Sequence, residues 1–151
     1  MADYTPVALP GQTWTFTAGG TLTGGDLVEV TGNNTVSKVA TLASTAFVGV
    51  ANNDATSGGR VTVTLSKAIH ESLADGTITA GSQLTTTNTA NRAVKALAAA
   101  ALNVDVTGTP TETTIENFNP AINTAVNQAR AVIGVAITSG TDNQSIRWAQ
   151  R

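Results

Sequence analysis

The hydrophobic pattern of this chain is organised around a short apolar stretch that occurs twice. The first copy, Phe47–Ala51, reads Phe-Val-Gly-Val-Ala, and the second, Val132–Ala136, reads Val-Ile-Gly-Val-Ala. A polar turn and an alternating strand follow each copy, at Arg60–Leu65 and at Ser145–Ala149. A central Gly in such a strand indicates that a neighbouring strand approaches closely. We therefore expect each copy to be the inner strand of a hairpin. The central residues, which we expect to be structural, are Gly49, Val50, Gly134 and Val135.

Apolar and polar residues also alternate in shorter stretches, as they do along strands with one buried face. Trp14 and Phe16 alternate with Thr residues, and we expect both aromatic side chains in the core, with an interface as the alternative. Asp26–Val30 and Thr35–Val39 flank Gly32–Asn34, which tolerates positive φ and predicts a hairpin turn.

One stretch fits two structures. In Lys67–Leu73, the residues Ile69 and Leu73 could share one face of a short helix or of a strand, and the surrounding pattern favours a strand. Asp75 and Gly76 then predict a turn.

The self-similarity extends beyond the apolar stretch. Gly81–Leu84 repeats Gly25–Val28, and Arg92–Leu97 repeats Thr35–Val39 at nearly the same spacing. The two copies of the apolar stretch, however, lie farther apart along the chain than these two pairs do. The chain therefore predicts two related β-units, the second with an insertion of about 29 residues between Leu97 and Ala131.

Composition supports an all-β fold. Thr is the commonest residue of the 151, and Val, Gly and Asn are plentiful, which favours strands joined by tight turns. Only 12% of the residues are charged, about half the usual share, and we expect them on solvated strand faces and turn tips. We predict a compact barrel-like β body over residues 13–151, preceded by an N-terminal arm over residues 1–12.

The arm and the insertion are the two predicted appendages. Pro6 and Pro10 favour an extended arm, with a frayed terminus as the alternative. The insertion, residues 98–130, begins as a Thr-rich loop that could hold a short strand at Val104–Val106. Asn119 and Pro120 then predict the start of a helix ending near residue 130. At about three turns this helix is too short to be stable alone, so it must dock.

Charge and composition argue against several partners and sites. The formal net charge is -2 and the eight Lys and Arg residues are scattered, so we expect no nucleic-acid partner. No apolar run reaches the length of a membrane span, and the N-terminus lacks the pattern of a signal peptide, so we expect synthesis in a cytoplasm and no membrane partner. The absence of Cys excludes disulfides and thiolate sites.

The sequence offers little enzymatic chemistry. His70 is the single histidine, and Ser72 and Asp75 lie near it, but no nucleophile elbow or oxyanion-hole pattern accompanies them. We expect this histidine to be a surface residue or a hydrogen-bonded one. The oxygen-rich turns at Asn52–Asp54 and at Asp142–Asn143 suit Asx caps, with a calcium site as the alternative. We therefore expect no catalytic residues, no cofactor and no metal, and hence not an enzyme.

Several segments in succession resemble phage capsid decoration proteins, also called head-decoration or capsid cement proteins. No one motif is specific to that family, but their order and spacing are similar from about residue 13 to residue 148. The segments are Thr23–Val28, Phe47–Ala51, Gly59–Val63, His70–Glu71, Ala74–Gly76, Thr79–Leu84 and Ala129–Ala136. One departure is Ser82, where Asp26 stands in the other copy.

The resemblance implies a β-tulip-like body that binds the outer surface of an assembled head as a homotrimer. It implies that the protein stabilises the shell by bridging subunits of the major capsid protein. We expect the arm to contact the capsid and the insertion to contact the trimer or the capsid. The arm residues proposed for this are Tyr4, Pro6, Val7, Leu9 and Pro10. Those of the insertion are Phe118, Pro120, Ile122 and Val126.

Two alternatives remain open from the sequence. Phage tail and fibre modules are also rich in Thr, Gly and strands, although fibres usually carry longer regular repeats. A carbohydrate-binding β module is the other, but it usually needs exposed aromatic residues, and this chain has few.

Overall fold

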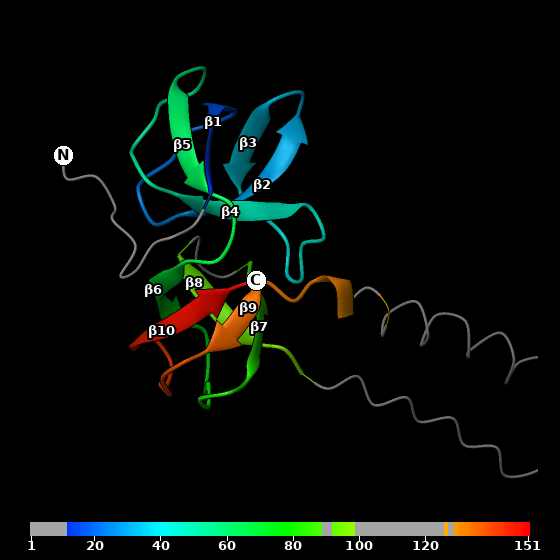
Figure 1. Ribbon diagram of the computed structural model, residues 1–151, viewed down its shortest axis with the longest axis vertical. Helices are drawn as coiled ribbons and strands as arrows, with labels where there is room; N and C mark the ends of the chain where they lie inside the picture. Colours follow the sequence, from blue (N-terminus) through cyan, green and yellow to red (C-terminus); the bar gives the residue numbers. More distant parts are fainter. Residues whose placement is uncertain (1–11, 89–91, 99–125, 127–128) are drawn as a thin grey trace, which may run out of the picture.

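The computed structural model describes residues 12–88, 92–98, 126 and 129–151 (Figure 1). In this part of the chain, ten β-strands form two closed five-stranded barrels. The two barrels follow one another along the sequence and are stacked in space. The structure confirms the prediction of an all-β body built from two related β-units.

The first barrel, which we call barrel 1, closes in the order β1-β3-β2-β4-β5. Its β1–β3 pair is parallel, and its other pairs are antiparallel. The predicted hairpins are both present, β2–β3 around the Asn33-Asn34 turn and β4–β5 after the first apolar stretch. Its strands are β1 (Thr13–Ala18), β2 (Leu27–Gly32), β3 (Thr35–Lys38), β4 (Phe47–Ala51) and β5 (Arg60–Thr64).

The second barrel, barrel 2, has the same connectivity, since β6 pairs with β8 in parallel and the remaining pairs are antiparallel. Strands β6 to β10 therefore correspond in order to β1 to β5. The ambiguous stretch before residue 74 is a strand, as the pattern favoured. The strands are β6 (Ile69–Ala74), β7 (Gln83–Thr86), β8 (Ala93–Ala96), β9 (Gly134–Ala136) and β10 (Ser145–Gln150).

Backbone hydrogen bonds repeat between the barrels as well. In barrel 1, the amide of Gly25 donates to the carbonyl of Ala51 at 2.8 Å. In barrel 2, the amide of Gly81 donates to the carbonyl of Ala136, also at 2.8 Å. Gly81 and Ala136 are thus farther apart in the sequence than Gly25 and Ala51, although they make the same contact. The predicted insertion lies between Gly81 and Ala136 and accounts for this difference.

The central glycines of the repeated stretch lie where two strands approach closely. A Cβ on Gly49 would overlap the carbonyl oxygen of Thr64 and lie 2.8 Å from Cγ1 of Val63. A Cβ on Gly134 would overlap the carbonyl oxygen of Ala149, and the Trp148 ring would lie 2.6 Å away. The close approach expected from the sequence is therefore present in both barrels.

Each barrel has its own apolar interior, but the two interiors are not equivalent. One buried cluster lies within barrel 1 and contains Leu22, Val28 and Val63. The other fills barrel 2 around Trp148 and also takes in residues of barrel 1. The barrel 1 residues in this second cluster are Leu27, Val39, Phe47 and Val50.

Barrel 1 thus closes one end of barrel 2, and β4 lies across that end (Figure 1). The connection between β3 and β4 reaches β7: the amides of Ala43 and Ser44 donate to the carbonyl and hydroxyl oxygens of Thr86, at 3.2 and 2.9 Å. Gln150 also joins the two barrels, because its Nε2 donates to the carbonyl of Leu65 at 2.8 Å. Polar contacts therefore surround the apolar centre of the junction.

Two expectations about individual residues were wrong. Trp14 is 60% exposed instead of lying in the core, because it stands at an end of barrel 1 that no described segment covers. Asp26 is 1% exposed instead of lying on a solvated face, because Lys38 and Arg92 pair with its carboxylate at 3.1 and 3.3 Å. Phe16, by contrast, packs against the interior of barrel 1 as expected.

Candidate interaction surface

The predicted contact residues lie mostly outside the described part of the chain. Val126 is the exception, since it is described, helical and 43% exposed. The predicted helix, apart from Val126 and the residues from 129 onward, and the Val104–Val106 strand lie outside the described residues. So do the remaining contact residues of the arm and the insertion, namely Tyr4, Pro6, Val7, Leu9, Pro10, Phe118, Pro120 and Ile122.

The described residues show how both appendages are joined to the barrels. The carbonyl of Gln12 accepts the amide of Leu65 at 2.8 Å, so the chain is paired from its first described residue. The insertion leaves barrel 2 after Leu97, whose amide donates to Gln83 at 2.8 Å. It returns at Ile133, whose amide donates to Leu84 at 2.9 Å. Both appendages therefore leave the barrels at hydrogen-bonded residues next to strand ends.

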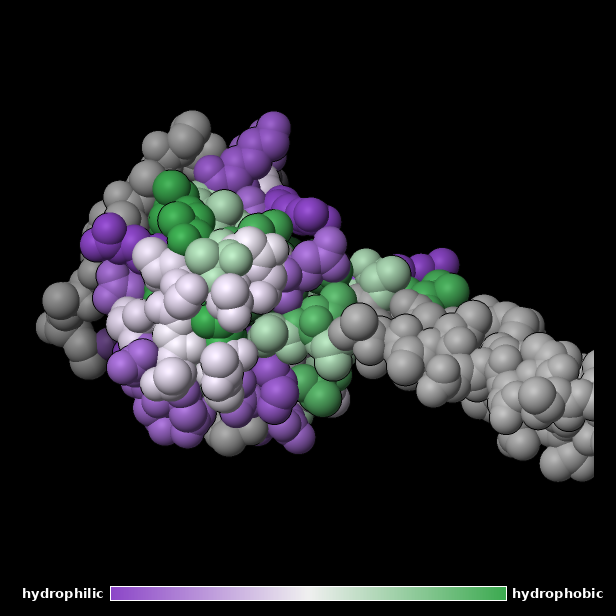
Figure 2. All heavy atoms as spheres, turned by 90° about the horizontal axis from the view of Figure 1, so that it is seen from below, coloured by the Kyte–Doolittle hydropathy of each residue, from purple (hydrophilic) through white to green (hydrophobic). Residues whose placement is uncertain are grey.

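Large apolar side chains are exposed at several places on the described surface. Figure 2 shows a face that is mostly polar or weakly polar, with apolar residues in several small, separate groups. The most exposed is Trp14, whose indole Nε1 donates to Oδ1 of Asn34 at 3.2 Å. Val30 lies on the neighbouring β2–β3 hairpin and is 44% exposed. The other exposed large apolar residues are Leu42, Leu73, Val126 and Ile137.

His70 is a buried residue of the barrel junction. Its ring lies 5.1 Å from that of Trp148, and its Nε2 lies 2.8 Å from Oε1 of Gln150. Because Oε1 is an acceptor, this Nε2 carries the proton. Burial lowers the pKa of His70 below its ordinary value, and the hydrogen bond to Gln150 opposes this only in part. Of the two placements expected for this histidine, the hydrogen-bonded one is confirmed, and the residue is fully buried.

The remaining residues considered for chemistry also have structural partners. Ser72 accepts the indole N–H of Trp148 at 2.9 Å, and Asp75 pairs with Lys95 and Thr87. These contacts hold β6, β8 and β10 together. They do not place Ser72 and Asp75 in a relay with His70.

The oxygen-rich turns use their side chains to cap backbone amides. Asp54 accepts the amide of Gly24 at 2.8 Å, and Asn53 accepts that of Thr62, also at 2.8 Å. Asp142 accepts the amide of Gly76 at 3.0 Å. Among the described residues, no three His, Asp or Glu side chains gather in a way that could hold a metal ion.

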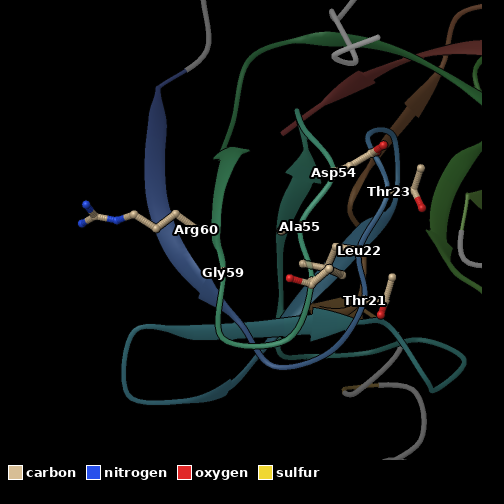
Figure 3. A pocket seen from close by; sticks show the side chains of 8 residues that line it. Thr21, Leu22, Thr23, Asp54, Ala55, Gly59 and Arg60 are labelled. Carbon is tan, nitrogen blue, oxygen red and sulfur yellow. The ribbon is translucent and has the colours of Figure 1, made fainter. Parts of the chain in front are cut away.

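A cavity of about 490 Å³ lies beside the connection between β1 and β2 (Figure 3). Its walls are held together by two hydrogen bonds between Leu22 and Ala55, at 2.8 and 3.0 Å. The ionisable residues at its edge are Asp54, which already caps Gly24, and Arg60, whose side chain extends away from the others in Figure 3. The cavity is therefore lined by Thr and apolar residues, and its two charged side chains do not point toward one another.

Within the residues that the structure describes, no helix has the length and apolar character needed to cross a membrane.

Comparison with known proteins shows a likeness in fold. The sequence matches no family model and no curated protein. Among solved structures, the fold is similar to that of the N base of the head fiber gp8.5 of bacteriophage phi29. The TM-score is 0.55 at 14% identity, and the match covers 94% of this chain and 95% of the other. At this identity the likeness shows a shared fold, which extends over nearly the full length of both chains.

Proposed function

We propose that this chain is a structural protein of a phage virion, without enzymatic activity, located on the outside of the head. One observation carries the proposal: its two-barrel fold is similar, over nearly its whole length, to that of a phage head fiber base. The succession of segments that resembles capsid decoration proteins supports the same role. The bonding pattern also fits, because the polar residues considered for chemistry are engaged in structural contacts.

Within that role, we propose that the chain is a decoration protein that bridges subunits of the major capsid protein. It would be made in the host cytoplasm and bind an already assembled head, as a homotrimer, with no nucleic acid or membrane as partner. Linking several weak contacts raises the effective concentration of each to about millimolar and increases avidity about 10²–10⁴-fold. Two appendages on each of three subunits would provide such linked contacts.

A head or tail fibre module is the second candidate, and the name of the similar structure favours it. Copy number and position separate the two roles. A decoration protein should cover the shell at many equivalent positions, whereas a fibre base should be sparse and lead into a longer appendage. Cryo-electron microscopy of virions, together with quantitative mass spectrometry of this chain against the capsid protein, measures both.

Binding to emptied heads tests the proposal directly. Purified protein added to heads that lack it should saturate at a fixed copy number and raise the temperature at which the heads rupture. Protein that neither binds heads nor occurs in virions would contradict the virion role. Protein found in virions only on the tail, or only in a few copies beneath a fibre, would contradict the decoration role.

The two appendages can be tested separately. Deleting residues 1–11 leaves Gln12 and its hydrogen bond to Leu65 in place. The insertion can be replaced using barrel 1 as the pattern, because residues 40–46 make the equivalent connection there. A chain in which residues 98–131 are exchanged for a copy of residues 40–46 should fold. If either appendage contacts the capsid, its removal lowers occupancy on heads, and unchanged occupancy with both removed would exclude both.

A further inference from the structure

The two barrels have the same connectivity, but only one of them has its end covered. At the covered end of barrel 2, His70, Thr86 and Gln150 are 0%, 0% and 5% exposed. The repeat relates these residues to Trp14, Val30 and Leu65 of barrel 1. There the first two are 60% and 44% exposed, whereas Leu65 is partly buried and its carbonyl accepts the hydrogen bond from Gln150. The same end is thus closed in barrel 2, and in barrel 1 it is open around Trp14 and Val30.

The surface that closes barrel 2 is the outer face of barrel 1. Leu27, Val39 and Val50 are 1%, 3% and 1% exposed because they pack into the cluster around Trp148. At the edge of this contact, Asp26 pairs with Arg92 across the junction, at 3.3 Å. The contact is therefore heterologous: an outer face of one barrel meets the end of the next.

The outer face of barrel 2 that corresponds to this surface is not covered by any described segment. Its residues Gln83, Leu97 and Val135 stand in place of Leu27, Val39 and Val50. Gln83 is exposed, and the other two are partly buried. The described chain thus carries two unused halves of the same contact, an open end on barrel 1 and an uncovered outer face on barrel 2.

The two unused halves also match in charge. The repeat places Asn34 at the position of Arg92, and Ser82 at the position of Asp26. Both members of the internal ion pair are therefore replaced by neutral residues at the unused halves, so no charge would be buried at these two positions. This gives a reason for Ser82, which departs from the acidic residue in the other copy.

We propose that the open end of barrel 1 receives the outer face of barrel 2 from a second copy of this chain, repeating between molecules the contact that joins the barrels within one. Trp14 and Val30 would be covered, with Gln83 and Val135 of the neighbouring copy against them. A heterologous contact of this kind either closes into a ring or continues as an open chain. Gln83 makes the outer face of barrel 2 more polar than the internal one at the position of Leu27, whereas Trp14 and Val30 make the open end of barrel 1 more apolar than His70 and Thr86 make the covered end.

Sedimentation of the full-length protein tests the association. The wild type should form oligomers, and Trp14→Ser should weaken the association at least roughly 30-fold, as removal of a central aromatic anchor does. Leu42→Ser is the matched control, because Leu42 is also an exposed apolar residue, at 52%, but lies outside both halves of the contact. Circular dichroism confirms that each variant is folded. A wild type that stays monomeric at every concentration, or equal weakening by both substitutions, would overturn the proposal.

Cross-linking identifies the two faces, because the chain has no Cys. Copies carrying Asn34→Cys, mixed with copies carrying Ser82→Cys, should be joined by a short bismaleimide, since the equivalent residues Arg92 and Asp26 touch within the chain. Replacing Ser82→Cys by Ser57→Cys, on the exposed loop before β5, provides the control. Cross-links no more frequent than in this control would overturn the proposal. So would cross-links that form only when capsid protein is added.

Discussion

Replacing the central glycine of the repeated stretch by alanine tests the close approach on which both barrels are built. In Gly49→Ala, the new Cβ would lie 2.8 Å from Cγ1 of Val63 and 2.9 Å from the carbonyl carbon of Thr64. Carbon atoms in contact prefer about 3.5–4.0 Å. The Val63 side chain can rotate away, but the Thr64 backbone cannot, because it pairs with Val50 in the β4–β5 ladder. The two strands must therefore separate.

The size of the effect follows from the usual cost of overpacking. Forcing extra carbon into a packed interior costs about 1–3 kcal/mol, and a clash with the backbone should lie at the upper end. We expect the free energy of unfolding to fall by about 3 kcal/mol, which for a chain of this length lowers the melting temperature by roughly 6–12 °C. Gly134→Ala should behave in the same way, since its Cβ would meet the Trp148 ring at 2.6 Å.

Urea denaturation followed by tryptophan fluorescence measures both variants, and Gly20→Ala is the matched control. A Cβ on Gly20 would have no atom within 4 Å, so this change should leave stability the same or raise it by about 0.4–1 kcal/mol. Loss of less than about 1 kcal/mol in both Gly49→Ala and Gly134→Ala would refute the reasoning. It would show that β4 and β9 do not press against their neighbours as the structure has them.

Three further outcomes are expected. Burial lowers the pKa of His70 below its value in the unfolded chain. The free energy of unfolding should therefore be highest above about pH 6.5 and fall as the pH drops toward the folded-state pKa, by at most about 1.4 kcal/mol per pH unit. Melting curves recorded from pH 7.5 to 5 should show this decrease, and His70→Gln should make it smaller. Asp26→Asn removes a buried charge from Lys38 and Arg92 and should cost about 1–3 kcal/mol in urea denaturation, and a change within error would contradict the role of this pair. Trp148→Ala should lower the free energy of unfolding by about 3–5 kcal/mol, because it leaves a cavity in the interior of barrel 2. Trp14→Ala, measured in a monomeric sample, should lower it by less than about 1 kcal/mol, because Trp14 is exposed. Equal losses in the two variants would contradict this difference in burial.

Much of the β body could be predicted because its signals are local. Alternation of apolar residues gave the strands, and Asn33-Asn34 gave a hairpin turn in which Asn34 adopts a φ of 50°. The sequence did not show that β6 corresponds to β1, because Ile69–Ala74 and Thr13–Ala18 share almost no residues at matching positions. What the two strands share is their place in the barrel, and strand pairing between distant segments leaves little trace in either sequence.

The candidate site was predictable only in part. The arm and the insertion could be recognised by composition and by their interruption of the repeat. The open end of barrel 1 could not, since alternation puts Trp14 on the same face as Phe16 and so predicts burial for both. Whether a residue at the end of a barrel is covered depends on what lies beyond that end, which no local pattern encodes.

The sequence alone determined that this chain folds into two related all-β units around a repeated Gly-containing strand, because side-chain period, turn residues and self-similarity are properties of short segments. The tertiary structure decided how the units are used. It closed the end of barrel 2 with the outer face of barrel 1, buried His70 and Asp26 at or near that junction, and left Trp14 exposed. Burial at a junction depends on which surfaces meet, and that is settled only when both barrels have formed and packed.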